Sequence, residues 1–221
     1  VCWYLDEPRR VTEIASRLAI TRQSVHNALA PLKGRALLAP SGPEYALSAE
    51  LKPLLTFVRA VVRHEHQQRL QDCAPSALIE WCDPKRALVS VQTEADTDTL
   101  QSASEWQLTG LARFQEYGLQ FSLGGEPPFW YGPETDLTAA QVVCHALARD
   151  PDSRRVSYAM LLCAHLDIDR ETLLDTARWY DLEPQVAAMY RALEGDFDIS
   201  PDISLPSKPE FVALNEQYGV A

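Results

Sequence analysis

The sequence lacks any apolar run long enough to cross a membrane, and it lacks a basic-then-apolar leader at its start. A membrane-spanning helix needs about 20 consecutive apolar residues. A secretory leader would join a positively charged stretch to an apolar one. These two absences predict a cytoplasmic protein that has no membrane partner.

Cysteine is scarce, and its spacing does not match that of zinc or redox sites. The sequence contains five cysteines that are scattered, odd in number and free of C-x-x-C spacing: Cys2, Cys73, Cys82, Cys144 and Cys163. Zinc and redox sites characteristically use that spacing. We therefore expect no metal, no cofactor and no disulfide, but buried or free thiols in a reducing compartment.

Charge is present but unevenly distributed. The 221 residues carry a net charge of -11, yet residues 1–71 hold ten Lys+Arg and six Asp+Glu, a net of +4. Residues 72–221 hold ten Lys+Arg and twenty-five Asp+Glu, a net of -15. A basic front joined to an acidic remainder is typical of a DNA-binding module attached to a second domain.

The N-terminal region has the pattern of two short helices followed by a hairpin. Ile14, Ala15 and Leu18 recur at helical spacing, and Thr21 suits the N-cap of a following helix. We expect the inner face of that helix to carry Val25, Ala28, Leu29 and Leu32. Extended runs at 35–39 and 45–47 flank the turn signal Pro40-Ser41-Gly42-Pro43-Glu44, which predicts a β-hairpin wing.

The outer face of the second helix carries side chains that read DNA bases. Arg22 and His26 form one row on this face, and Gln23 and Asn27 form the adjacent row. Arginine can bond the O6 and N7 of guanine together, and Asn or Gln can bond the N6 and N7 of adenine.

Other residues near this helix suit the phosphate backbone. Thr21 and Ser24 lie at the helix start, where the positive end of the dipole favours a phosphate. Four basic residues are expected to neutralise backbone charge: Arg9, Arg10, Lys33 and Arg35.

Residues 11–29, VTEIASRLAITRQSVHNAL, resemble the helix-turn-helix of MarR- and ArsR-like winged-helix regulators, and residues 32–38 resemble their lead into the wing. The resemblance covers about residues 1–70. It implies a dimer that reads a pseudo-palindrome in double-stranded DNA through Arg22, Gln23, Ser24, His26 and Asn27. The wing tip, residues 41–44, departs from the pattern because it holds no Arg or Lys.

These patterns predict an α+β fold that is mostly helical. We expect a winged helix-turn-helix at 1–48, a long connecting and dimerisation helix with its linker at 49–76, an acidic sensor or partner domain at 77–195 and a Pro-rich tail at 196–221. The long helix carries an apolar stripe of Leu51, Leu54, Leu55, Val58 and Val62.

The second domain is expected to be mixed, with helices toward its C-terminal end. The pattern predicts strands at 87–91, 119–123 and 129–131. It predicts helices at 99–117, 136–149, 153–165, 170–180 and 184–193. We expect the tail to be an extended arm that ends in a short helix.

Four groups in the chain invite a chemical role, and each has a plainer interpretation that we favour. Glu94, Asp96 and Asp98 could hold Mg²⁺ as in nucleotidyltransferases, but a solvated loop is the simpler expectation. His64 and His66 could sense a metal, but positions i and i+2 of a helix point in different directions, which favours a solvated helix end. His145 and His165 are expected to be hydrogen-bonded histidines rather than catalytic bases. The aromatic residues 129–131 could line a pocket or belong to the core, and we favour the core.

The sequence therefore predicts a non-enzymatic, dimeric prokaryotic transcriptional regulator with an effector or protein-partner domain. A weak resemblance of residues 173–193 to antitoxin-type regulators keeps open an antitoxin that represses its own operon and neutralises a toxin. A nucleotidyltransferase-like enzyme with a DNA-binding domain is the second alternative.

Overall fold

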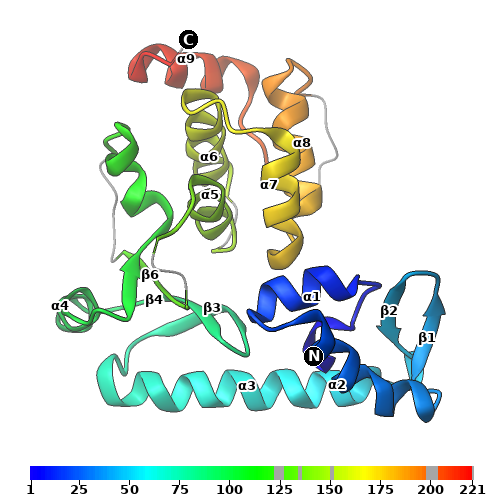
Figure 1. The fold of residues 1–221 in the computed structure, drawn as a ribbon. Helices are drawn as coiled ribbons and strands as arrows, with labels where there is room; N and C mark the ends of the chain where they lie inside the picture. Colours follow the sequence, from blue (N-terminus) through cyan, green and yellow to red (C-terminus); the bar gives the residue numbers. More distant parts are fainter. Residues whose placement is uncertain (122–126, 134–135, 150–151, 198–203, 221) are drawn as a thin grey trace. The chain divides into compact units, whose positions relative to one another are not determined.

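The computed structural model describes residues 1–121, 127–133, 136–149, 152–197 and 204–220 (Figure 1). Its fold is α+β and mostly helical, as the sequence predicts. The chain divides into two compact units, which are described separately below. The first unit holds Val1–Arg69 and Cys82–Lys85, and the second holds Leu70–Trp81 and Arg86–Ala221. Among the described residues, no helix combines the length and the apolar character that crossing a membrane requires.

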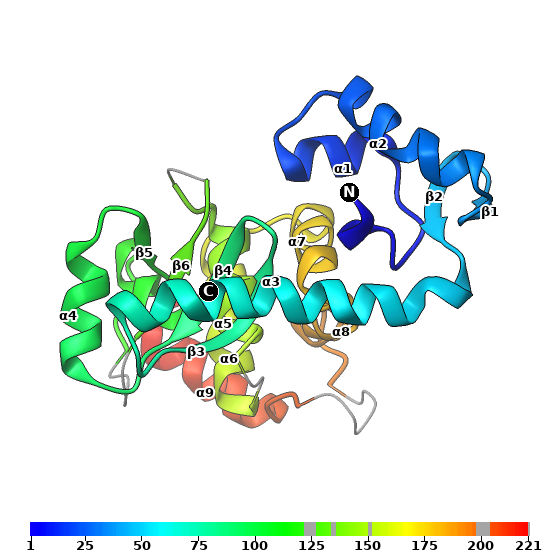
Figure 2. The same cartoon turned by 90° about the horizontal axis from the view of Figure 1, so that it is seen from below.

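The first unit is a winged helix-turn-helix that is followed along the chain by a long helix (Figure 2). Strands β1 and β2 pair antiparallel from Leu38↔Leu47 to Ser41↔Glu44, which leaves Gly42 and Pro43 as the turn. Gly42 adopts a positive φ of 60°, which the tight turn requires and glycine tolerates best. In chain order the elements are η1 Cys2–Tyr4, α1 Val11–Leu18, α2 Arg22–Gly34, β1 Leu38–Ser41, β2 Glu44–Leu47, η2 Ala49–Leu51 and the start of α3 Lys52–Cys73.

Helix α3 continues from the first unit into the second. Leu55 and Val62 of the predicted stripe are buried, but Leu54 is exposed. Phe57 and Val61 are exposed with it. The described residues therefore cover the face of α3 that carries Leu55 and Val62 and leave the face that carries Leu54, Phe57 and Val61 exposed.

The second unit contains a small sheet with the order β3-β4-β6-β5. Strand β6 pairs antiparallel with β4 on one side and with β5 on the other. Residues of β4 and β6, including Leu88, Phe129 and Trp130, are almost completely buried. The aromatic residues 129 and 130 are therefore core, as expected. The strands are β3 Leu78–Asp83, β4 Arg86–Ser90, β5 Trp106–Leu108 and β6 Pro128–Tyr131.

Helices form the rest of the second unit and its main core. Val142, Val143 and Leu147 of α5 and Leu161 of α6 have no exposed surface and pack in one apolar cluster. Figure 1 shows α5 beside α6 and α7 beside α8. The remaining elements are α4 Glu94–Ser102, η3 Gly110–Tyr117, α5 Ala139–Leu147, α6 Ser153–His165, α7 Arg170–Ala177, η4 Arg178–Tyr180, α8 Glu183–Leu193 and α9 Lys208–Tyr218.

The second unit differs from the sequence prediction at three elements. The helix expected at 99–117 is three elements: the end of α4, the strand β5 and the 3-10 helix η3. Strand β3 was not predicted from the sequence. The strand expected at 119–123 is absent from the described residues 119–121, and its last two positions lie outside the described residues.

Candidate nucleic-acid interface

The helix-turn-helix is fixed by buried residues on both helices and by a tight turn between them. Ile14 of α1 and Val25 of α2 have no exposed surface, and Leu29 is 2% exposed. Ala19 ends α1 in the left-handed conformation, with a φ of 51°. This turn reverses the chain within three residues, so that α2 begins at Arg22.

The face of α2 opposite the buried residues is exposed. Arg22, Gln23, His26 and Asn27, which were expected to face outward, are all solvent-accessible. Ala28 was expected on the inner face but is exposed, because only Val25 and Leu29 reach the interior from this helix. The outer face is therefore broader than predicted.

Two amides on this face are already oriented. Gln23 Nε2 donates a hydrogen bond to Asn27 Oδ1 at 2.8 Å. Each primary amide has one acceptor oxygen and two donor hydrogens. The pair therefore retains the carbonyl oxygen of Gln23 and the amide donors of Asn27 as groups that could bond an adenine edge, which needs one donor and one acceptor.

The N-terminus of α2 is arranged to receive an anion. Thr21 Oγ1 accepts a hydrogen bond from the Ser24 backbone N–H at 3.1 Å, which confirms Thr21 as the N-cap. The hydroxyls of Thr21 and Ser24 also bond each other at 2.9 Å. The first turn of α2 contains no acidic residue, so no carboxylate opposes a phosphate at the positive end of the helix dipole.

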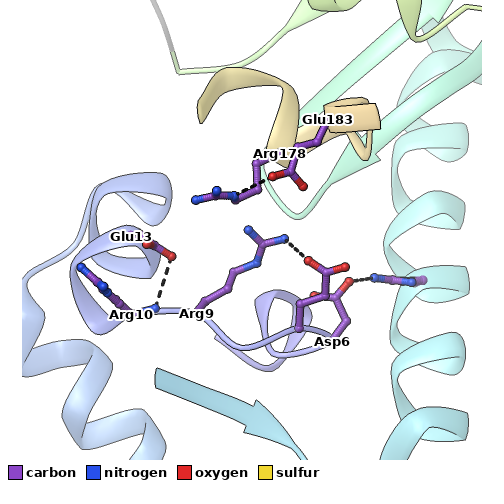
Figure 3. Close-up of polar contacts among 8 residues, drawn as sticks. Asp6, Arg9, Arg10, Glu13, Arg178 and Glu183 are labelled. Carbon is purple, nitrogen blue, oxygen red and sulfur yellow. Dashed lines mark hydrogen bonds and ion pairs between the residues drawn. The ribbon is translucent and has the colours of Figure 1, made fainter. Parts of the chain in front are cut away.

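The four basic residues expected to contact phosphate differ in exposure. Arg10, Lys33 and Arg35 are exposed. The guanidinium of Arg9 is buried and lies 3.6 Å from Glu7, so Arg9 leaves the set of candidate contacts. The neighbouring side chains of Arg9 and Arg10 point in different directions, and the backbone N–H of Arg10 donates to Glu13 Oε2 at 3.2 Å (Figure 3).

A buried carboxylate holds α1 in place, and the sequence did not predict this contact. Asp83 has no exposed surface. Its Oδ2 accepts a hydrogen bond from the Tyr4 hydroxyl at 2.8 Å and lies 3.3 Å from Nε of Arg17, a residue of α1. Lys85 adds a second attachment, because its Nζ donates to the carbonyl of Leu18 at 2.6 Å. The segment Cys82–Lys85 thus holds the C-terminal half of α1 in place.

His66 also contacts the segment Cys82–Lys85. It is 6% exposed, and its Nε2 lies 2.8 Å from the backbone oxygen of Asp83. The expected solvated helix end was therefore wrong for His66. The only signal in the sequence was its spacing from Val62 and Leu70, which are buried on the same side of α3.

The acidic group of the second unit does not converge on one point. Glu94, Asp96 and Asp98 lie on α4 rather than in a loop. Asp96 is buried and accepts a hydrogen bond from the Ser76 backbone N–H at 2.8 Å, whereas Asp98 is exposed. Across the part of the chain that the structure describes, no three His, Cys, Asp or Glu side chains gather as metal ligands would.

The two predicted hydrogen-bonded histidines are confirmed. His145 has no exposed surface, and its two ring nitrogens lie 2.7 Å from Thr109 Oγ1 and 2.9 Å from the Tyr180 hydroxyl. His165 is exposed and bonds the carbonyl of Tyr117 at 3.0 Å. The five cysteines, all at described positions, are thiols rather than disulfides. Burial raises the pKa of Cys163 to about 12, which makes it inert near neutral pH.

Comparison with known proteins identifies the second unit. A family model described as HVO_2833_C, C-terminal, matches residues 103–220, more than half of the chain. The chain therefore belongs to this family. Comparison with curated proteins gives no match, and comparison with solved structures gives none. The matched region begins just before β5 and ends after α9, so it does not include the helix-turn-helix.

Proposed function

We propose that this member of the HVO_2833_C family is a sequence-specific regulator of transcription that binds double-stranded DNA in the cytoplasm. The observation that carries the proposal is the exposed face of α2, where Arg22, Gln23, His26 and Asn27 stand opposite a buried Val25. In helix-turn-helix proteins the second helix enters the major groove, and side chains of these types read base edges there.

The charge of the first unit supports the same proposal. It contains eleven Lys+Arg and seven Asp+Glu, a net of +4, in a protein whose net charge is -11. Arg10 precedes α1, Lys33 lies in the last turn of α2 and Arg35 follows it; all three are exposed and would contact the phosphate backbone. The wing tip adds no positive charge, so we assign the contacts to α2 and its flanks.

We further propose that the protein binds DNA as a homodimer through α3. Leu54, Phe57 and Val61 are 49%, 65% and 39% exposed and recur at spacings of three and four, which places them along one face. A second copy of the chain is the proposed partner, because helix-turn-helix dimers bind two symmetric half-sites. An isologous interface uses the same patch on both copies, and in the proposed dimer this stripe would pack against its own copy across a two-fold axis.

The test is fluorescence anisotropy with the DNA upstream of the protein's own gene and with a scrambled duplex, over a salt series. We expect tighter binding to the upstream DNA, affinity that falls steeply with salt, and loss of sequence preference in Arg22→Ala. One bidentate arginine contact contributes about 1–3 kcal/mol of discrimination, so the preference should fall by about fivefold or more.

Arg170→Ala is the matched control, because it removes one exposed arginine from α7 and leaves α2 intact. It should retain the sequence preference. If the wild-type protein binds neither duplex at low salt, the proposal is wrong, and the α2 face is a protein-contact surface.

A further inference from the structure

The second unit contains a cavity of about 480 Å³. Its walls come mainly from η3, from the C-terminal end of α5 and from the first turns of α6, and single residues of α4, β5 and β6 and the segment after η3 also line it. Cavities of about 300–1,000 Å³ are the size that binds small organic molecules. All the lining residues except Gln101 lie within the region that the family model matches.

One part of the cavity wall is apolar and closely packed. It includes Leu108, Leu111, Phe121 and the ring of Tyr158, which stacks on Phe121 at 4.1 Å between ring centroids. Gly110 lies close to two lining residues, Pro128 and Ala146. It has a positive φ of 56°, and a Cβ there would lie 3.0 Å from Cγ of Pro128, a lining residue. A larger residue at 110 would therefore press against Pro128.

The other part of the wall is cationic. Arg149, Arg154 and Arg155 line the cavity, and Asp152 is the one acid among the lining residues that the structure describes. The chain from residue 72 onward has twenty-five acids and ten basic residues, so three arginines at one cavity run against the local composition. An excess of positive charge at a concave site concentrates anions. Arg149 is paired with Glu80 at 3.6 Å, so Arg154 and Arg155 supply that excess.

Local contacts fix this cationic wall. Arg154 Nε donates to the Tyr158 hydroxyl at 3.3 Å, and its guanidinium lies 5.6 Å from the centre of the Tyr158 ring. Arg155 donates to the backbone oxygen of Arg149, which joins the ends of α5 and α6. Asp152 caps α6 by accepting from the Arg155 N–H at 2.7 Å, so one of its oxygens is committed to the helix.

We propose that this cavity binds a small organic anion, a molecule with an apolar ring system and one acidic group. The ring system would lie against Leu108, Leu111 and Phe121, and the acidic group would face Arg154 and the neighbouring arginines. A guanidinium offers five donors in a planar fork that matches a carboxylate, sulfonate or phosphate. A role of this cavity in regulating DNA binding rests on the proposed function. The binding of an organic anion does not depend on that function.

The binding test uses two fluorescent probes with the same rings. Anilinonaphthalene sulfonate carries an acidic group, and N-phenylnaphthylamine is the uncharged counterpart. We expect the full-length protein to bind the sulfonate more tightly. Arg154→Gln should weaken sulfonate binding by about tenfold or more, because a hydrogen bond to a charged group contributes about 1.5–3 kcal/mol. It should leave binding of the uncharged probe within about twofold.

Two further variants keep this test decisive. Arg170→Gln removes an exposed arginine that lies outside the cavity lining and should leave both probes unaffected. Leu111→Trp adds a bulky ring to the apolar wall and should weaken both probes, with the thermal midpoint recorded to show that the variant folds. The proposal is overturned if the two probes bind equally, or if Arg154→Gln and Arg170→Gln give the same sulfonate affinity.

A last experiment separates anion binding in the cavity from DNA binding by α2. Probe binding is measured without DNA, so it can succeed even if neither duplex binds. Where DNA does bind, saturating sulfonate should change the anisotropy-derived affinity of the wild-type protein and leave that of Leu111→Trp unchanged. An unchanged wild-type affinity would overturn the regulatory role while leaving the binding site intact.

Discussion

Asp83 shows how much one side chain can contribute to the helix-turn-helix. Its carboxylate has no exposed surface and receives the Tyr4 hydroxyl and the Arg17 guanidinium. We predict that Asp83→Ala lowers the free energy of unfolding by about 3–5 kcal/mol, because it leaves a buried guanidinium without its counter-charge. Urea unfolding followed by circular dichroism measures this loss.

Companion variants separate the charge from the individual bonds. Tyr4→Phe should cost about 1.5–3 kcal/mol, since it removes one hydrogen bond to a charged group. Asp98→Ala, at an exposed position of α4, should stay within about 0.5 kcal/mol of the wild type. Equal unfolding midpoints for Asp83→Ala and Asp98→Ala would show that the buried network does not stabilise the fold.

Distance along the chain explains why this network was not predicted. Tyr4 and Asp83 are 79 residues apart, and His66 and Asp83 are 17 apart. No local pattern marks such a contact, because a charged residue at the end of a strand is usually found on the surface. The outward-facing position of Arg22, Gln23, His26 and Asn27 was predicted from the sequence because it follows from one local periodicity on one helix.

The same contrast holds for whole elements. Helix α6 was predicted with the bounds that the structure has, and α1, α2 and the wing were found within a few residues. These elements have strong caps or turns, such as Asp152 before α6. The helix predicted at 99–117 was wrong because Trp106–Leu108 pairs with β6. A pairing partner more than twenty residues away overrides local helical spacing.

Helix α2 allows its stability to be tested apart from its function. Thr21→Ala removes the N-cap bond to Ser24 and should cost about 1 kcal/mol of stability. Thr21→Asp preserves the cap, and its negative charge favours the helix N-terminus. It should therefore keep the thermal midpoint but weaken DNA binding, because the carboxylate would face a phosphate.

Thr21→Asn completes this set, since it caps the helix without adding charge. It should match the wild type in stability and bind DNA more tightly than Thr21→Asp. The comparison is made by thermal unfolding and by anisotropy at one salt concentration. If Thr21→Asp binds DNA as well as Thr21→Asn does, the N-terminus of α2 does not lie against the phosphate backbone.

At the scale of the whole molecule, the two units carry opposite net charge. The first has +4, and the second has nine Lys+Arg and twenty-four Asp+Glu, a net of -15. Binding to a polyanion therefore depends on the first unit, and the second contributes repulsion that salt screens within about 10 Å. Two copies of α2 in one complex double the favourable contacts, which is why the proposed dimer matters for affinity.

The dimer is tested on the exposed stripe of α3. Phe57→Arg replaces the most exposed of its three apolar side chains with a charge. Burying such a side chain contributes about 1.5–3 kcal/mol, and a two-fold interface contains it twice, so dimerisation should weaken about a hundredfold or more. Sedimentation velocity over a concentration series measures this change.

Val212→Arg makes a comparable substitution at a 45% exposed position of α9 and should leave the dimer intact. A wild-type protein that stays monomeric at all concentrations, or a Phe57→Arg dimer as tight as the wild type, would rule out α3 as the interface.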